Sequence, residues 1–193
     1  MTGEAATTGE LAGRELIVGV AGGVAAYKSA ALVSRLVQEG AGVSVVMTRA
    51  AEAFIGRATF AALTARPVAT EVFDETAFPL GAHIELAEQA ELLCVAPATA
   101  NFLAKAAGGL ADDLLSTLYL SFGGLVLAAP AMNCDMWEKP AVQRNVEQLR
   151  ADGATIVGPD EGWLSCRKRG AGRMASPEEI HKTILELLRT GGG

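Results

Sequence analysis

Residues 15–40, ELIVGVAGGVAAYKSAALVSRLVQEG, contain the pattern from which the fold class is predicted. Residues 15–21 form an apolar run of strand length, and residues 24–39 place Ala26, Ala30 and Val33 on one helical stripe that stops at Gly40. An apolar strand that runs through two glycines into such a helix is typical of a parallel sheet covered on both faces. Ligands of such sheets bind at the carboxyl ends of the strands, so the loops after the strands are where chemistry is expected.

The same alternation continues along the chain. Strands are predicted at residues 42–48, 68–73, 91–96, 125–129 and 154–157, and helices at 51–63, 84–90, 100–107, 112–122 and 140–151. A last helix begins after Ser176, where Pro177 and Glu179 complete the pattern of a capping box. The predicted fold class is α/β, a doubly wound parallel sheet in a flavodoxin- or Rossmann-like three-layer sandwich. Residues 15–190 form one domain between a flexible N-terminal tail, 1–14, and a short tail, 191–193.

Composition narrows the function classes. Half of the 193 residues are apolar, the mean hydropathy is +0.29 and only 20% are charged, which predicts apolar surface buried between subunits. The net charge is −6, and the basic run 167–169 stands alone, so nucleic acid is not an expected partner. Three cysteines without a signal peptide or a membrane-spanning stretch predict a reducing, cytoplasmic location and no membrane partner.

The first two loops suit a phosphate. Gly22 and Gly23 let backbone N–H groups approach an anion at a helix N-terminus, although a plain glycine turn is the alternative. The spacing is neither the G-x-G-x-x-G fingerprint nor a Walker loop. The second strand ends in Thr48 and Arg49 and not in the acidic residue that holds a nicotinamide ribose. A hydroxyl and a cation favour a phosphate or a flavin ribityl chain, and a simple strand exit remains open.

The third and fourth loops carry hydrogen-bonding and apolar groups. Thr99 and Asn101 follow the strand 91–96, where Thr99 either contacts a ligand or only caps the next helix. Residues 129–137, APAMNCDMW, combine methionine, asparagine and tryptophan in a way that packing alone explains poorly. The amide of Asn133 can donate to a carboxylate without carrying charge.

Two further residues are candidates for proton transfer. His83 precedes a helix and is catalytic or structural, whereas His181 on the last helix is predicted to be a solvated surface residue. Residues 158–174 form a long glycine-rich segment without periodicity, which is typical of a lid or a disordered link. Cys166 lies at its centre beside three cations, which favours a reactive thiol with a lowered pKa, and an incidental or buried cysteine is the alternative.

Four segments occur together in one order, and they carry a resemblance. They are Gly22-Gly23-Val24-Ala25-Ala26-Tyr27-Lys28, Pro97-Ala98-Thr99-Ala100-Asn101, Pro130-Ala131-Met132-Asn133-x-x-Met136-Trp137 and Cys166-x-x-x-Gly170-x-Gly172-Arg173-Met174. The chain resembles the homo-oligomeric flavin-containing cysteine decarboxylases over residues 14–188. The last two motifs discriminate, and the glycine loop alone would not.

The resemblance implies a set of functional residues. FMN would lie on Gly22, Gly23, Val24, Thr48, Phe54, Ala98, Thr99, Asn101 and Met132. His83, Asn133 and Cys166 would be catalytic: His83 at a subunit boundary beside a neighbour's flavin, Asn133 on the substrate carboxylate, and Cys166 as the acid on a substrate-clamping flap, 158–174. Met136 would contact the substrate with Asn133. Arg167 and Lys168 depart from the Gly-Asp or Gly-Asn that the family usually has after this cysteine; the two cations suit a substrate phosphate, and a different substrate is the alternative. The assembly would be a homotrimer or a homododecamer, and no metal is implied.

The resemblance also implies the reaction. Within the family the chain most resembles the members of coenzyme A biosynthesis, which convert 4′-phosphopantothenoylcysteine to 4′-phosphopantetheine. FMN would oxidise the cysteine side chain so that CO₂ can leave, and Cys166 would protonate the resulting enethiol. The alternative is decarboxylation of the C-terminal cysteine of a ribosomally made peptide to an aminoenethiol. A flavin prenyltransferase and a binding subunit without catalysis are further alternatives.

Overall fold

The computed structural model describes residues 9–73 and 76–191, and its centre is a six-stranded parallel sheet. The strands are β1 (Glu15–Val20), β2 (Gly42–Met47), β3 (Val68–Ala69), β4 (Leu92–Ala98), β5 (Leu125–Pro130) and β6 (Thr155–Ile156). Their order in the sheet is β3-β2-β1-β4-β5-β6. The predicted fold class, a doubly wound α/β sandwich, is therefore confirmed.

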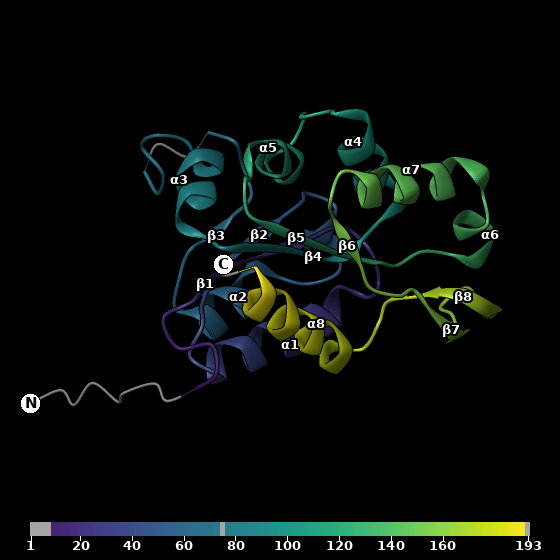
Figure 1. The fold of residues 1–193 in the computed structure, drawn as a ribbon, viewed down its shortest axis with the longest axis horizontal. Coiled ribbons are helices and arrows are strands. Elements are labelled where there is room, and N and C mark those ends of the chain that lie inside the picture. The colour runs from purple at the N-terminus through teal and green to yellow at the C-terminus, as the bar shows by residue number, and fades with distance from the viewer. Residues whose placement is uncertain (1–8, 74–75, 192–193) are drawn as a thin grey trace, which may run out of the picture.

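Helices cover both faces of the sheet (Figure 1). One layer holds α1 (Ala26–Gln38), α2 (Arg57–Thr64) and α8 (Pro177–Thr190), and the other holds α3 (Ala82–Gln89), α4 (Ala100–Gly108), α5 (Leu114–Ser121) and α7 (Pro140–Ala151). Successive strand residues alternate between the two layers: Leu16 and Val18 of β1 belong to the core under α1, and Ile17 belongs to the core on the opposite face. Because both faces are covered, the central strands are mostly apolar, and β4 is buried at every position.

The order of the strands alone predicts where a ligand should bind. The chain winds from β1 outward to β3 and then crosses to β4 on the other side of β1. The loops after β1 and β4 therefore diverge, and they leave a crevice at the carboxyl edge of the sheet. The glycine loop and the Thr99 loop are these two loops.

Three regions differ from the prediction. The helix expected at 51–63 is divided into a short turn, η1 (Ala51–Ala53), and α2, because Gly56 is the extended N-cap of the second piece. A four-residue helix, α6 (Cys134–Trp137), follows Asn133 and is too short for a periodic pattern to indicate it. The segment 158–174 forms an antiparallel hairpin of β7 (Asp160–Trp163) and β8 (Arg169–Arg173), whose glycines hide the alternation that a strand usually shows.

The ends of the domain also need correction. His181 is 4% exposed, and its Nε2 lies 2.6 Å from Glu39 Oε2, so the prediction of a solvated residue was wrong. The apolar stripe of α8 gave no sign of this partner on α1. Leu11, within the expected tail 1–14, is buried and donates its N–H to Glu39 O at 3.1 Å, while residues 1–8 lie outside the described residues. Over the described ranges, no helix has the length and apolar character needed to cross a membrane.

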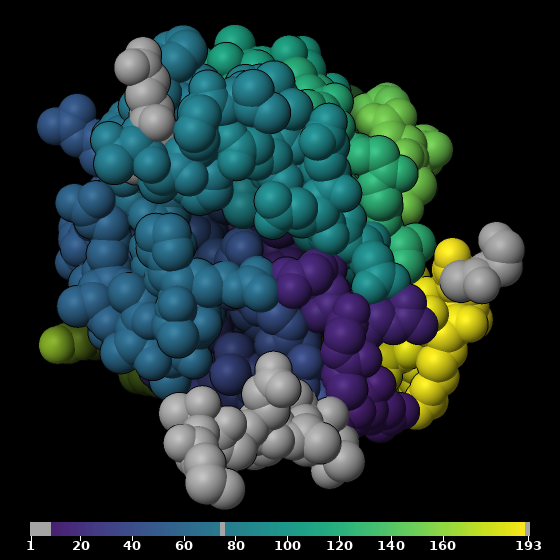
Figure 2. Space-filling model, turned by 90° about the vertical axis from the view of Figure 1, so that its left-hand side faces the viewer, coloured from purple at the N-terminus to yellow at the C-terminus, as the bar shows by residue number. Residues whose placement is uncertain are grey.

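One segment of the chain carries several exposed apolar side chains. Residues 57–73 and 76–90, coloured blue to teal, form much of the face shown in Figure 2. This segment includes Phe73, Leu80 and Ile84, which are 88%, 71% and 40% exposed. Large apolar side chains grouped in one segment are typical of surfaces that contact another protein.

Candidate active site

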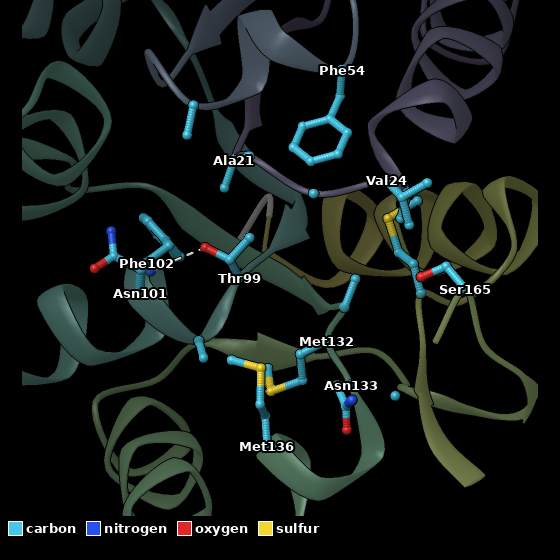
Figure 3. A pocket seen from close by; sticks show the side chains of 18 of the residues that line it. Ala21, Val24, Phe54, Thr99, Asn101, Phe102, Met132, Asn133, Met136 and Ser165 are labelled. Carbon is cyan, nitrogen blue, oxygen red and sulfur yellow. Dashed lines mark hydrogen bonds between the residues drawn. The ribbon is translucent and has the colours of Figure 1, made fainter. Parts of the chain in front are cut away.

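A cavity of about 890 Å³ opens at the carboxyl ends of β1, β4 and β5, between the sheet and the β7–β8 hairpin. All four predicted loops contribute to its wall. The residues predicted for the site that line it are Gly22, Gly23, Val24, Thr48, Phe54, Thr99, Asn101, Met132, Asn133, Met136 and Cys166. Figure 3 shows Phe54 on one side, Met132, Asn133 and Met136 opposite, Asn101 on a third side and Val24 with Ser165 on the fourth. The structure therefore brings the four motifs to one place.

The glycine loop approaches its neighbour too closely for a side chain. A Cβ on Gly22 would lie 2.4 Å from Ala50 Cβ, whereas a Cβ on Gly23 would meet only Thr99 Cγ2, at 3.7 Å. Helix α1 follows directly, and its N-cap residue Ala25 makes no side-chain hydrogen bond. The loop thus brings backbone and the positive end of a helix to the cavity, which is an environment for a phosphate.

The second and third loops supply the sides. Thr48 donates its backbone N–H to Val20 O at 3.0 Å, which fixes the exit of β2 against β1, and Phe54 is 51% exposed at the cavity. Thr99 Oγ1 accepts from Phe102 N at 3.3 Å, so Thr99 is the N-cap of α4 and also lines the cavity. The two interpretations of Thr99 are therefore compatible.

Helix α4 closes its side of the cavity with an ion-pair cluster. Lys105 Nζ lies 2.5 Å from Asp112 Oδ1 and 2.6 Å from Asp113 Oδ2. Burial opposes the charge of Lys105, but hydrogen bonds to Asp112 and Asp113 outweigh this and raise the pKa of the lysine. Burial likewise opposes the charge of Asp113, yet hydrogen bonds from Lys105 and Ser116 hold its pKa below the usual value. Two carboxylates of the same chain therefore balance the positive charge of Lys105.

Asn133 is held with one end of its amide occupied. It is the N-cap of α6, and its Oδ1 accepts from Asp135 N at 2.7 Å. The Nδ2 group is thereby left as the donor that the residue can offer to a ligand. An amide donor at the edge of the cavity suits a carboxylate, because it needs no countercharge when the site is empty.

The hairpin covers the cavity and is attached at its base. Met132 donates its N–H to Gly172 O at 2.9 Å, and a Cβ on Gly172 would lie 2.3 Å from Met132 O. At the tip, Leu164 N donates to Lys168 O at 2.9 Å, and Arg167 has a φ of 62°. The tip carries Cys166, which is exposed and lines the cavity.

The three cysteines differ in access. Burial raises the pKa of Cys94 to about 12, and this thiol lies in the sheet among apolar side chains. Cys134 is also buried, under Gly170 of the hairpin. Cys166 is thus the thiol with access to both solvent and cavity.

Three of the predicted binding residues lie outside the cavity wall. The side chain of Ala98 is buried in the core, and its carbonyl accepts from Ala131 N at 3.0 Å. Arg167 and Lys168 are exposed at the hairpin tip, and Lys168 Nζ pairs with Asp135 Oδ2 at 2.5 Å. The register of β4 shifts between Val95 and Ala98, and the side chain of Ala98 packs in the core with Val95. The ion pair with Asp135 holds Lys168 against α6. A sequence motif shows neither effect.

His83 also lies outside the cavity of its own chain. It is in the first turn of α3, half-buried, and the Oγ of Ser121 donates to its backbone carbonyl at 3.4 Å. Its Nδ1 is buried without a hydrogen-bond partner in the described part of the chain. The single chain therefore gathers Asn133 and Cys166 but not His83.

Several cavity residues had no predicted role. Lys28, Trp163 and Arg173 line the cavity. Lys28 and Arg173 belong to the motifs quoted above, so their charge within a ligand-binding motif was the available signal. Trp163 carried no such signal, because its place depends on the hairpin.

Comparison with known proteins identifies relatives of the whole domain. The family model described as "Flavoprotein" matches residues 4–189. A Bacillus subtilis protein, the "Coenzyme A biosynthesis bifunctional protein CoaBC", is 46% identical over 169 residues, 88% of this chain and 42% of that protein. The chain thus spans less than half the length of this curated relative.

Two solved structures have a similar fold over more than nine-tenths of this chain. The FMN-dependent cysteine decarboxylase SpaF is 36% identical with a TM-score of 0.80, and the match covers 95% of this chain and 99% of SpaF. A cysteine-to-serine mutant of PPC decarboxylase complexed with pantothenoylaminoethenethiol is 28% identical with a TM-score of 0.81, covering 91% and 98% of the two chains.

Proposed function

The chain belongs to the flavoprotein family, and we propose that it uses FMN to decarboxylate a substrate that ends in a cysteine carboxylate. The substrate is proposed to be 4′-phosphopantothenoylcysteine, and the product 4′-phosphopantetheine for coenzyme A. The observation that carries this proposal is the 46% identity to a coenzyme A biosynthesis protein along 88% of the chain. Its proposed location is the cytoplasm.

The residues present fit FMN. Gly22 has no room for a side chain, α1 begins without a side-chain cap, and the loop between them lines the cavity. These groups would hold the flavin phosphate through backbone N–H groups, and Phe54, Thr99, Asn101 and Met132 would contact the rest of the cofactor. When bound, FMN supplies the oxidation of the cysteine side chain that makes loss of CO₂ feasible.

Asn133 and Cys166 have distinct proposed tasks. The Nδ2 of Asn133 donates to the substrate carboxylate, since its Oδ1 is engaged by Asp135 N. Met136 presents an apolar surface beside it (Figure 3). Cys166, on the hairpin tip, would give a proton to one carbon of the enethiol. The reduced FMN would return the hydride that it had taken from the cysteine side chain, and the proton and the hydride together would give the saturated thiol. The hairpin excludes water while the substrate is held.

His83 is proposed to act on the neighbouring subunit's substrate. Its place outside its own cavity and its buried, unpartnered Nδ1 within the described residues support this arrangement. Leu80 and Ile84 are exposed next to it in the sequence and offer apolar area for a contact. The proposed assembly is a homotrimer or a homododecamer in which the site lies between two chains.

Decarboxylation of a peptide's C-terminal cysteine is the second candidate. SpaF, an FMN-dependent cysteine decarboxylase that is 36% identical to this chain, carries no coenzyme A precursor in its name. The likeness to SpaF therefore supports decarboxylation of a cysteine carboxylate without restricting the substrate to 4′-phosphopantothenoylcysteine. Both candidates require the same cofactor and the same carboxylate contact.

A direct experiment tests the proposed reaction. The purified protein is expected to be yellow and to release FMN on denaturation, which chromatography can identify. It is then incubated with 4′-phosphopantothenoylcysteine and, separately, with peptides that end in cysteine. Mass spectrometry should detect the loss of CO₂ from the first substrate. Loss of CO₂ from the peptides alone would establish the second candidate, and a protein that binds FAD or no flavin would refute both.

A further inference from the structure

Two cations share one part of the cavity wall. Lys28 extends from the first turn of α1, and its Nζ donates to Met174 O at 2.9 Å. Arg173, the residue before Met174, ends β8 at the base of the hairpin. Both side chains line the cavity, and neither has a role in the reaction described above. Helix α1 and the hairpin therefore bring two positive charges close to each other.

The guanidinium of Arg173 lies over Gly162 of the facing strand. A Cβ on Gly162 would lie 3.1 Å from Arg173 Cζ, so the glycine leaves room for the side chain across the hairpin. Arg173 Nη2 forms an ion pair with Asp160 Oδ2 at 3.6 Å, a distance too long for a hydrogen bond. The guanidinium therefore still has N–H donors for a ligand, although Asp160 balances part of its charge. The ammonium of Lys28 uses one of its three donors on Met174 O.

The two charges repel each other in the chain by itself. Burial and then the charge of Arg173 lower the pKa of Lys28, and Asp160 and Glu178 offset part of this effect. An anion bound between the cations would relieve the repulsion and would be drawn there by both charges. Asn133, a neutral donor, suits the substrate carboxylate and leaves this second anion site free for another group.

We propose that Lys28 and Arg173 together bind a phosphate monoester, and that its source is the phosphate of the substrate. The glycine loop already offers uncapped backbone N–H groups for the flavin phosphate, so a second phosphate site implies a second phosphorylated ligand. A planar guanidinium with a nearby ammonium matches a dianion better than a single carboxylate. This inference rests on the proposed function for the substrate's identity, and it assigns a phosphorylated small molecule to the site in preference to a peptide.

Ligand binding to the FMN-loaded protein tests the site without requiring turnover. Calorimetry would give the dissociation constants of 4′-phosphopantothenate and of pantothenate, which differ only in the phosphate and contain no cysteine. We expect the phosphorylated ligand to bind roughly tenfold or more tightly, as a charge-assisted contact allows. The preference should fall toward unity in Arg173→Gln and in Lys28→Gln. Arg169→Gln is the matched control, because Arg169 lies on the same strand and is exposed outside the cavity wall.

The possible results of this binding experiment lead to different conclusions. A preference that survives both substitutions overturns the proposal. If the preference is unaffected but the variants release FMN faster on dilution, and riboflavin-loaded protein shows no such change, the bound phosphate belongs to the flavin and the substrate assignment is wrong. If the phosphate preference depends on both cations and yet no substrate loses CO₂, the site stands and the proposed reaction fails.

Discussion

The cavity and the first turn of α3 are built in opposite ways. Around the cavity, polar groups find partners inside the chain: Asp135 N donates to Asn133 Oδ1, and Lys105 pairs with two aspartates. At α3, Nδ1 of His83 is buried without a partner in the described residues, and Leu80 and Ile84 expose apolar surface. One chain assembles the wall of the first region, whereas the second region exposes apolar area of the kind that contacts another protein.

This difference separates the proposed cofactor-binding residues from the residue proposed for proton transfer. The small residues and backbone groups proposed to hold the flavin come from loops at one edge of one sheet, so the fold itself assembles them. His83 lies on a helix whose position is not tied to that edge in the same chain. Substitutions in the two regions should therefore have different effects. Substitutions at the cavity should weaken FMN binding, whereas substitution of His83 should lower turnover while FMN stays bound.

The largest effect is expected for His83→Asn. An imidazole that transfers a proton near neutral pH contributes roughly 10²–10⁴-fold to a rate. Turnover should fall by about that factor while FMN occupancy, measured by absorbance, stays at the wild-type level. The matched control is His181→Asn, since His181 pairs with Glu39 and does not line the cavity, so this substitution should affect stability only. Full turnover in His83→Asn would return this residue to a structural role.

Cys166→Ser should stop the reaction halfway. Removing the acid on the hairpin tip spares oxidation and loss of CO₂ but blocks protonation at carbon, so the enethiol should accumulate in place of the saturated thiol. Mass spectrometry of the products from both proteins shows which thiol forms. Cys134→Ser is the control, because this thiol is buried beneath Gly170. Saturated product at an undiminished rate from Cys166→Ser would exclude the cysteine as the acid.

A pair of glycine substitutions tests the cofactor side. Gly22→Ala places a Cβ at 2.4 Å from Ala50 Cβ and must displace the loop, at a cost of about 1–3 kcal/mol typical of overpacking. Gly23→Ala meets only Thr99 Cγ2 at 3.7 Å. Weaker FMN binding and a lower melting temperature are expected for the first variant and near wild-type values for the second. Equal losses in both would mean that close backbone approach at Gly22 is not what shapes the site.

The smallest effect concerns the ion pair in the cavity wall. Asp113→Asn keeps an oxygen that can accept from Ser116 N but removes the charge beside Lys105. Because the pKa of Asp113 is lowered in the folded chain, its charge stabilises the fold above the unfolded-state pKa of about 4 and loses this effect as the pH falls below it. The variant should unfold with a free energy about 1 kcal/mol lower at pH 7, a difference that should shrink in acid. Denaturant titrations at several pH values measure this, and a difference that grows in acid would contradict the assigned sign.

The fold was predictable because its signals are local. The apolar runs around β1 and β2 and the stripe of α1 each fit within one element, and the strand–loop rule then placed Gly22, Thr99 and Asn133 at one edge. Contacts between distant segments could not be predicted. His181 is buried against Glu39, 142 residues earlier, and Lys168 pairs with Asp135, 33 residues earlier. Such partners leave no periodic trace in a sequence.

Mixed oligomers test the division of the site between two chains most directly. His83→Asn and Asn133→Asp would be co-expressed with different tags, and oligomers carrying both tags would be isolated after light scattering has given their size. Each variant alone should be inactive, one for want of the imidazole and the other because a carboxylate repels the substrate. If the site lies between subunits, the mixed oligomers contain an intact Asn133 facing a neighbour's intact His83, and they should regain measurable decarboxylation. Mixed oligomers as inactive as their parents, or an active monomer, would show that the site is built within a single chain.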